Sequence, residues 1–270
     1  MRYTIIGAIF LVFLLVGACF SQESSSGIDP EALIAQIIKV ESEQQANLHD
    51  IIYDAEYVEG ETKEDGNFEE NVRFVKRIYI KYLPDSALFH EEYLQCYEKG
   101  KQQDSGDCQK TAAERLEKKR RRNALDISFP MIRPFTARQR HLYTITYQGI
   151  ASTQIENRTC HKFHAVAIEP ADSLINGDYY FESEGFHLVR VDFTPSKLVR
   201  RSMFKMSEMN MSLAFAPTAD GFWLPQQFKI SMKARAMWVI GIKVKGTEDY
   251  RNPVINQPID PKIFEATNVK

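Results

Sequence analysis

Strict alternation of apolar and polar residues constrains this chain more than any other feature. From Gln227 to Arg235 every second residue is apolar, and the residues between them are polar or basic. Successive side chains of a strand point to opposite faces, so this run predicts a strand with one apolar and one polar face. The run from Met237 to Val244 keeps the same parity and predicts the second strand of a hairpin. Such alternation is typical of an antiparallel sheet with one face in water.

Other alternating runs predict strands along most of the chain. They lie at residues 71–82, 143–147, 160–169, 178–182, 187–193 and 209–215. Turn residues separate several of these runs, namely Asn176-Gly177, Ser183-Glu184-Gly185 and Asp220-Gly221. The predicted fold class is α+β, mainly β, built on one large antiparallel sheet.

One amphipathic helix precedes the strands. Asp29-Pro30 indicates an N-cap followed by a first-turn proline, and an apolar stripe at helical spacing continues to about Asp50. A single helix of this length cannot cover so many strands, so we expect the apolar face of the sheet to keep an apolar cavity. Six of the eight methionines lie between Met203 and Met237, and methionine adapts to ligands of variable shape. The alternative is that these residues only fill a core.

The first residues carry an export signal. Arg2 and an apolar run from Ile5 to Val16 have the proportions of a secretory signal peptide, which we assign to residues 1–18. Gly17-Ala18-Cys19 resembles the bacterial lipobox, and that resemblance implies cleavage before Cys19 and its acylation as a membrane anchor. Ordinary cleavage near Ala18 is the alternative. Residues 19–28 then form a tether, and residues 29–270 form a single domain.

Composition agrees with a folded, exported domain. The 270 residues are 44% hydrophobic and 26% charged, and the formal net charge of −2 offers no general attraction for nucleic acid. Cys96 and Cys108 flank a polar stretch, and we predict a disulfide between them. Closing that loop of about 13 residues would stabilise the fold by roughly 3 kcal/mol. Cys160 is then expected to be a buried thiol on a strand.

The segment from Glu91 to Arg133 departs from the strand pattern and is predicted to be an insert. It contains the two cysteines of the predicted disulfide and a polar helix near residues 111–123. Its basic run Lys118 to Arg122 would suit anionic phospholipid headgroups, or it forms a solvated helix end. Connections of this length are often lids or binding elements.

The sequence contains no motif that indicates catalysis. Nucleophile elbows, glycine-rich phosphate loops and zinc helices are absent from it. Cys160 and His164 would lie on one face of a strand and His161 on the other, so they cannot jointly bind one metal ion. We therefore expect no enzyme activity, no catalytic residues, no metal and no cofactor.

Several loose motifs occur in an order that resembles a known superfamily. They are Tyr147-Gln148-Gly149 leading to Glu169-Pro170, then Asp220-Gly221-Phe222-Trp223-Leu224-Pro225, and finally the segment from Asn256 to Phe264. With the single long helix before them, they resemble the outer-membrane lipoprotein-sorting (Lol carrier-like) superfamily of periplasmic proteins. The resemblance implies a curved antiparallel sheet, an incomplete barrel, that is covered by an N-terminal helix and here also by the helical insert.

The same resemblance implies that the apolar interior binds acyl chains. The residues that would line it are those that strand parity also places on one apolar face: Val189, Val191, Phe193, Phe228, Ile230, Met232, Trp238 and Ile240. We expect a monomeric lipoprotein that faces the periplasm and binds a lipid or the acyl chain of a lipoprotein, for transfer to the outer membrane. Phe20 after the acylated cysteine favours the outer over the inner membrane. The alternative is an interaction lipoprotein with a packed core that recognises a protein partner through the insert.

Overall fold

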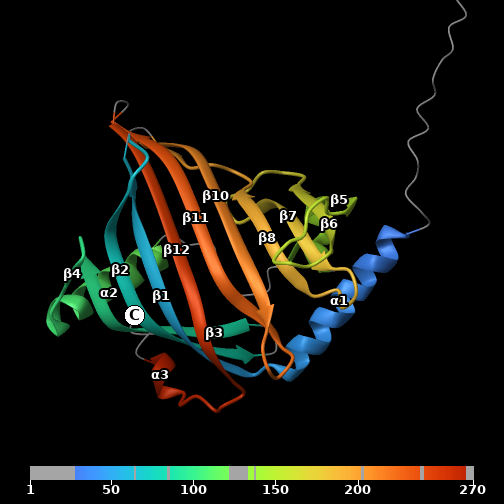
Figure 1. Ribbon diagram of the computed structural model, residues 1–270, viewed down its shortest axis with the longest axis horizontal. Coiled ribbons are helices and arrows are strands. Elements are labelled where there is room, and N and C mark those ends of the chain that lie inside the picture. Colours follow the sequence, from blue (N-terminus) through green and yellow to red (C-terminus); the bar gives the residue numbers. More distant parts are fainter. Residues whose placement is uncertain are drawn as a thin grey trace, which may run out of the picture.

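One twisted antiparallel sheet forms the body of the protein (Figure 1). The computed structural model describes residues 28–63, 65–83, 86–121, 133–136, 138–201, 204–237 and 240–265. The strands follow the order β4-β3-β2-β1-β12-β11-β10-β8-β7-β6-β5, and β9 pairs with β10. In the described part of the chain β4 and β5 do not pair with each other, so the sheet is not closed into a barrel. The predicted fold class is confirmed.

The helices are few. They are α1 (Pro30–Asn47), α2 (Ser105–Arg121), α3 (Lys262–Glu265) and the short 3-10 helices η1 (Arg133–Phe135) and η2 (Arg140–Leu142). The first strands are β1 (Asp50–Thr62), β2 (Phe68–Leu83), β3 (Ser86–Glu98), β4 (Lys101–Gln102), β5 (Tyr143–Ile150) and β6 (Cys160–Ala167). The others are β7 (Ile175–Glu182), β8 (Leu188–Pro195), β9 (Arg200–Arg201), β10 (Phe204–Pro217), β11 (Trp223–Ala236) and β12 (Ile240–Ile255).

Helix α1 forms where the sequence predicts it. The Asp29 carboxylate accepts a hydrogen bond from the backbone N–H of Glu31 at 3.0 Å, and Pro30 occupies the first turn. Ile34 and Ile37 are buried against the sheet. At the other end the Gln44 side chain accepts a bond from the Trp223 N–H (2.7 Å) and donates one to the Trp223 carbonyl (3.0 Å). The helix is thus packed at its start and hydrogen-bonded at its end.

The prediction of a turn at Asn176-Gly177 is wrong, because both residues lie inside strand β7. A Cβ atom at residue 177 would lie only 2.8 Å from the Asp192 carbonyl oxygen and 2.9 Å from the Cβ of Phe193. Glycine therefore permits close approach of two strands here. The Asn176 side chain accepts a hydrogen bond from the Ala167 N–H at 2.8 Å, which joins β7 to the end of β6. By contrast, the turn at Asp220-Gly221 is confirmed, with φ of 84° at Gly221.

The segment predicted as an insert begins inside β3, which runs to Glu98 before the short β4 and helix α2. Cys96 and Cys108 form the predicted disulfide, which joins the end of β3 to the first turn of α2. Both cysteines are buried beside Phe74. Cys160 is the buried free thiol that the sequence predicts. The disulfide therefore ties α2 to the edge of the sheet.

We predict that replacing both cysteines, as Cys96→Ser/Cys108→Ser, lowers the free energy of unfolding by about 3 kcal/mol, because the unfolded chain regains the freedom of the open loop. Urea denaturation of the oxidised proteins measures this difference. Reductant should lower the denaturation midpoint of the parent protein and leave that of the double variant unchanged. Equal midpoints for the oxidised parent and the variant would contradict the prediction.

Candidate functional site

The two faces of the sheet differ in character. The inner face packs against α1 and η1 and carries buried residues such as Phe163, Val191 and Leu213. The outer face carries the alternate residues, which are mainly polar. Inner-face apolar residues form separate buried clusters, the largest beside α1 and others around Tyr53 and Phe74. The core is therefore not continuous along the whole inner face.

The structure divides the residues predicted to bind a ligand into two groups. Val189, Val191, Phe193 and Phe228 lie in the large buried cluster with Ile34 and Ile37 of α1. Ile230 and Met232 lie further along β11 and are only half-buried. Trp238 lies outside the described residues, and Ile240 begins β12 with a side chain that is not described. The first group is buried, and the second is partly buried, with Ile230 packed against the edge of the same cluster.

A strip of half-exposed apolar side chains continues from this second group. We call it the apolar strip, and it consists of Met209, Ile230, Met232, Ile242 and Val244. Strand register places these side chains together on the inner face, with Met209 opposite Met232 and Met232 opposite Val244. Gly246 lies opposite Ile230, and a Cβ there would approach the Tyr57 hydroxyl to 3.1 Å. The strip therefore runs across three strands beside the covered core.

A buried charged cluster lies on the inner face of β2, β3 and β12. Lys76 is only 3% exposed, and its ammonium group is ion-paired with Glu91 and lies 2.7 Å from a carboxylate oxygen of Glu248. The Tyr93 hydroxyl donates a hydrogen bond to Glu91 at 3.3 Å. Burial alone would lower the pKa of Lys76, but the carboxylates of Glu248 and Glu91 outweigh it and raise that pKa. Lys76 is therefore charged, and it is held by two carboxylates.

Helix α2 reaches the same region through Arg115. Its guanidinium lies 4.4 Å above the Phe74 ring and 3.5 Å from a carboxylate oxygen of Glu59, which also accepts a hydrogen bond from the Tyr57 hydroxyl. Sequence reasoning missed this cluster, although Lys76 has the parity of the apolar residues of β2. That exception to the alternation was the available signal. The interior of the sheet is therefore apolar along the strip and ionic beside it.

Helix α1 also carries a partly buried acid, Glu41. Burial raises the pKa of Glu41 to about 7, although a hydrogen bond from the Leu188 backbone N–H opposes the shift. Burial raises the pKa of Tyr82 on β2, and the nearby Glu41 carboxyl group raises it further. Glu41 thus lies between α1, β2 and β8, where protonation would stabilise the packed helix.

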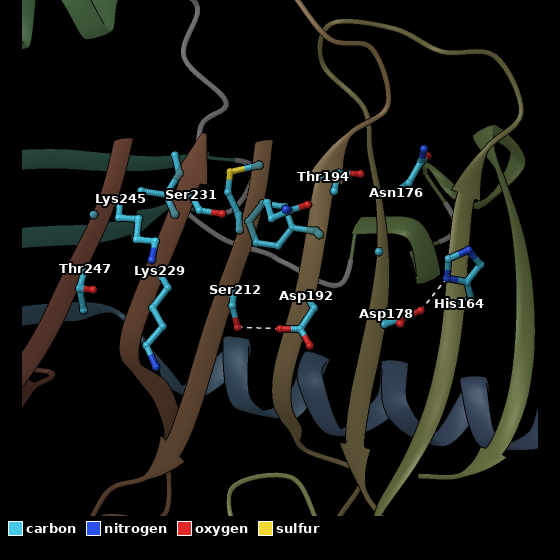
Figure 2. A pocket seen from close by; sticks show the side chains of 16 residues that line it. His164, Asn176, Asp178, Asp192, Thr194, Ser212, Lys229, Ser231, Lys245 and Thr247 are labelled. Atoms are coloured by element: carbon cyan, nitrogen blue, oxygen red, sulfur yellow. Dashed lines mark hydrogen bonds and ion pairs between the residues drawn. The ribbon is translucent and has the colours of Figure 1, made fainter. Parts of the chain in front are cut away.

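A hollow of about 630 Å³ crosses the outer face, on the opposite side of the sheet from α1 (Figure 2). Two rows of polar side chains border it, as Figure 2 shows. One row contains His164, Asp178, Asp192, Ser212, Lys229 and Thr247, and the other contains Asn176, Thr194, Ser231 and Lys245. Asn210 also lines the hollow, and strand register places it opposite Ser231. The hollow therefore lies on the polar face, whereas the sequence predicts a cavity on the apolar face.

Acidic residues at one end of this hollow already have partners. The Asp178 carboxylate lies 2.6 Å from the His164 ring and 3.0 Å from the Lys162 ammonium. Asp192 accepts a hydrogen bond from the Ser212 hydroxyl at 2.6 Å and forms an ion pair with Arg190 at 2.8 Å. These pairs stabilise neighbouring strands and leave little free negative charge at this end.

His161 and His164 lie on opposite faces of β6. His161 is buried on the inner face, where its ring lies 2.9 Å from the Tyr147 hydroxyl, whereas His164 lies on the outer face. Burial raises the pKa of Cys160 to about 11, so this thiol is protonated at neutral pH. Across the described ranges, no group of three or more His, Cys, Asp or Glu residues could hold a metal ion.

The described helices also show no membrane span. None of them combines the length and the apolar character that crossing a bilayer requires.

Comparison with known proteins gives likeness of fold at low identity. No protein family and no curated protein matches the sequence. A DUF1329 family protein from Desulfovibrio piger is 11% identical, with a TM-score of 0.49 over 90% of this chain and 100% of that one. A lipoprotein-sorting domain from Vibrio parahaemolyticus is 9% identical, with a TM-score of 0.40 over 86% of this chain and 97% of that one.

A LolA superfamily protein from Nitrosomonas europaea is 8% identical, with a TM-score of 0.36 over 88% of this chain and 98% of that one. The function proposed below depends on the geometry of this chain alone.

We predict that Lys76→Met destabilises the fold by about 3–5 kcal/mol, because it leaves Glu91 and Glu248 buried without their shared cation. Urea denaturation measures the effect. Lys39→Met on α1 is the control, since the Lys39–Glu43 pair is about two-thirds exposed, at 65% and 64%. This control should change stability by less than about 1 kcal/mol. Equal effects of the two substitutions would contradict the assignment.

We also predict that stability falls as pH rises from about 5 to 8. The folded-state pKa of Glu41, about 7, lies above its ordinary value of 4.5, so folding favours the protonated acid and loses that advantage on ionisation. Glu41→Gln should remove a pH-dependent contribution on the order of 2 kcal/mol. Glu43→Gln, on the exposed side of the same helix, should not. Denaturation at several pH values tests this, and identical pH profiles for all three proteins would refute it.

Proposed function

We propose that the protein binds a lipid or acyl chain on the inner face of its sheet. The observation that carries the proposal is the apolar strip, whose five side chains stay partly exposed beside the large buried cluster. Apolar side chains grouped on a concave sheet offer an acyl chain about 0.8 kcal/mol for each buried CH₂. Two of the five residues are methionines, whose flexible side chains fit chains of different length and saturation.

Helix α1 is the proposed cover of the rest of the site. Its buried contacts to the sheet centre on Ile34 and Ile37, and Gln44 supplies two hydrogen bonds at its end. Displacement of this helix would join the apolar strip to Val191 and Phe228 in one longer apolar surface. The described residues predicted from strand parity, on β8 and β11, would then serve one ligand. We place no chemical step in this mechanism, since binding and release suffice for a carrier.

We retain the proposal that the chain is an exported lipoprotein that faces the periplasm. The signal peptide and Cys19 lie within residues 1–27, as does all of the tether except Ile28. The structure describes none of residues 1–27. The proposal rests on their sequence alone. The described domain begins at Ile28, so an anchor at Cys19 would leave α1 close to a membrane. Transfer of the ligand to the outer membrane is the proposed role.

One observation favours the alternative of a protein-binding lipoprotein with a closed core. Phe135 is fully buried and packs edge-on against Phe163, Tyr179 and Phe181, with ring centroids 5.1–5.6 Å apart. This part of the interior has no room for a ligand unless the chain near η1 moves. On this alternative, the segment from Glu91 to Arg133 would recognise the partner.

We predict that Ile230→Glu or Met232→Glu weakens binding of an apolar probe at least tenfold, because a carboxylate on the strip would have to be desolvated. Binding is measured by fluorescence of the neutral probe N-phenyl-1-naphthylamine, and native mass spectrometry identifies any lipid that copurifies. Ser231→Glu is the matched control, since it introduces the same charge between them on the outer face. If folded Ile230→Glu protein binds the probe as the parent does, the strip is not the site.

A further inference from the structure

The outer face of β10, β11 and β12 carries a concentration of positive charge. Its six exposed basic residues, which we call the basic face, are Lys205, Lys229, Lys233, Arg235, Lys243 and Lys245. Among the described residues of these strands, one acidic residue, Glu208, lies between the cations. It pairs with Lys233 at 2.6 Å. The whole chain has a formal net charge of −2, so this local excess of cations is a separation of charge within the sheet.

Strand register places like charges directly opposite one another. Lys205 lies opposite Arg235, and Lys233 lies opposite Lys243. Directly opposed like charges destabilise an antiparallel pair. Apart from the Lys233–Glu208 pair, the described residues show no ion pair that relieves this repulsion. An anionic partner in front of the face would relieve it.

The hollow on the outer face ends among these cations. Lys229 and Lys245 line it together with Ser231, Asn210 and Thr247, as Figure 2 shows for the residues it labels. At the opposite end Asp178 and Asp192 are neutralised by their own partners. Lys229 and Lys245 form no ion pair within the described structure. The group that would complete this end is therefore an anion with several acceptor oxygens, such as a phosphate.

An exposed apolar residue follows the basic face at the end of β11. Met237 is 56% exposed and adopts a positive φ of 47° where the chain leaves the strand. It follows Arg235 by two residues, at the end of the strand that carries Lys229, Lys233 and Arg235. Cations that bind headgroups next to an apolar side chain are typical of peripheral attachment to membranes.

We propose that the basic face docks the protein on a membrane that contains anionic phospholipids. The lipid phosphate lies at the Lys229 and Lys245 end of the hollow, and Met237 meets the headgroup boundary. The surface involved is the opposite face of the sheet from the apolar strip. Docking therefore leaves the inner face accessible and does not depend on the function proposed above. It also differs from attachment through Cys19, because it requires the folded sheet.

Cosedimentation with lipid vesicles tests this proposal on the full chain. All proteins carry Cys19→Ser, so that none is acylated, and each is measured with phosphatidylcholine vesicles and with vesicles containing 30% phosphatidylglycerol. Contributions from the N-terminal residues are then the same in every protein. The readout is the ratio of the affinity for the anionic vesicles to the affinity for the phosphatidylcholine vesicles, which we call the gain. We expect the parent protein to bind the anionic vesicles at least tenfold more tightly in 0.05 M salt. In 0.5 M salt this preference should disappear, because salt screens exposed charges.

The variant Lys229→Gln/Lys243→Gln/Lys245→Gln should reduce this gain at least tenfold. Lys39→Gln/Lys101→Gln/Lys110→Gln removes the same charge from exposed positions of α1, β4 and α2, and it should keep the gain. Ile230→Glu should also keep it, which separates this proposal from the apolar site. Equal losses in both triple variants, or no preference of the parent for anionic vesicles, would overturn the proposal. It would also be overturned if the basic-face variant lost binding to a DNA duplex but not to vesicles.

Discussion

The continuous antiparallel pairing from β4 to β5 is the constraint on which the rest of the structure depends. Every strand on this path is hydrogen-bonded to its neighbours, and the resulting sheet has far more inner face than α1 and α2 can cover. Each inner residue must therefore be buried by the curvature of the sheet, by a helix, or by a ligand. The division of the interior into separate buried clusters, with half-exposed residues between them, follows from this shortage of cover.

The charged cluster around Lys76 shows how the fold accommodates the part of the interior that is not apolar. A single buried ammonium group would be expensive, but Glu91 and Glu248 come from the neighbouring strand β3 and from β12, and they neutralise it. Arg115 and Glu59 add a second pair, which brings α2 against the same region. The disulfide to Cys108 holds the start of that helix in place. Ionic and covalent contacts thus organise one side of the interior, and apolar packing organises the other.

The two faces of the sheet are suited to different partners. Side chains that alternate along β11 place Ile230 and Met232 on the inner face and Lys229 and Lys233 on the outer face. A protein that receives an acyl chain on one face and meets anionic headgroups with the other would approach a membrane in a defined orientation. The same strand would then couple recognition of the membrane to the position of the ligand site. This arrangement follows from period-two alternation in a sheet whose two faces both keep accessible side chains.

Local patterns in the sequence predicted α1, most of the strands and the character of each face, but they missed β1 and β3. The N-cap at Asp29, the alternation in β11 and the pairing of Cys96 with Cys108 each depend on residues close together in the chain. Contacts between distant segments required the tertiary structure. Lys76 meets Glu248, and Lys205 lies opposite Arg235, only because strand register brings them together. Asn176-Gly177 has the composition of a turn, but close packing on β8 keeps it in a strand. Periodicity determines which face a side chain occupies, and register across the sheet decides which side chains it meets.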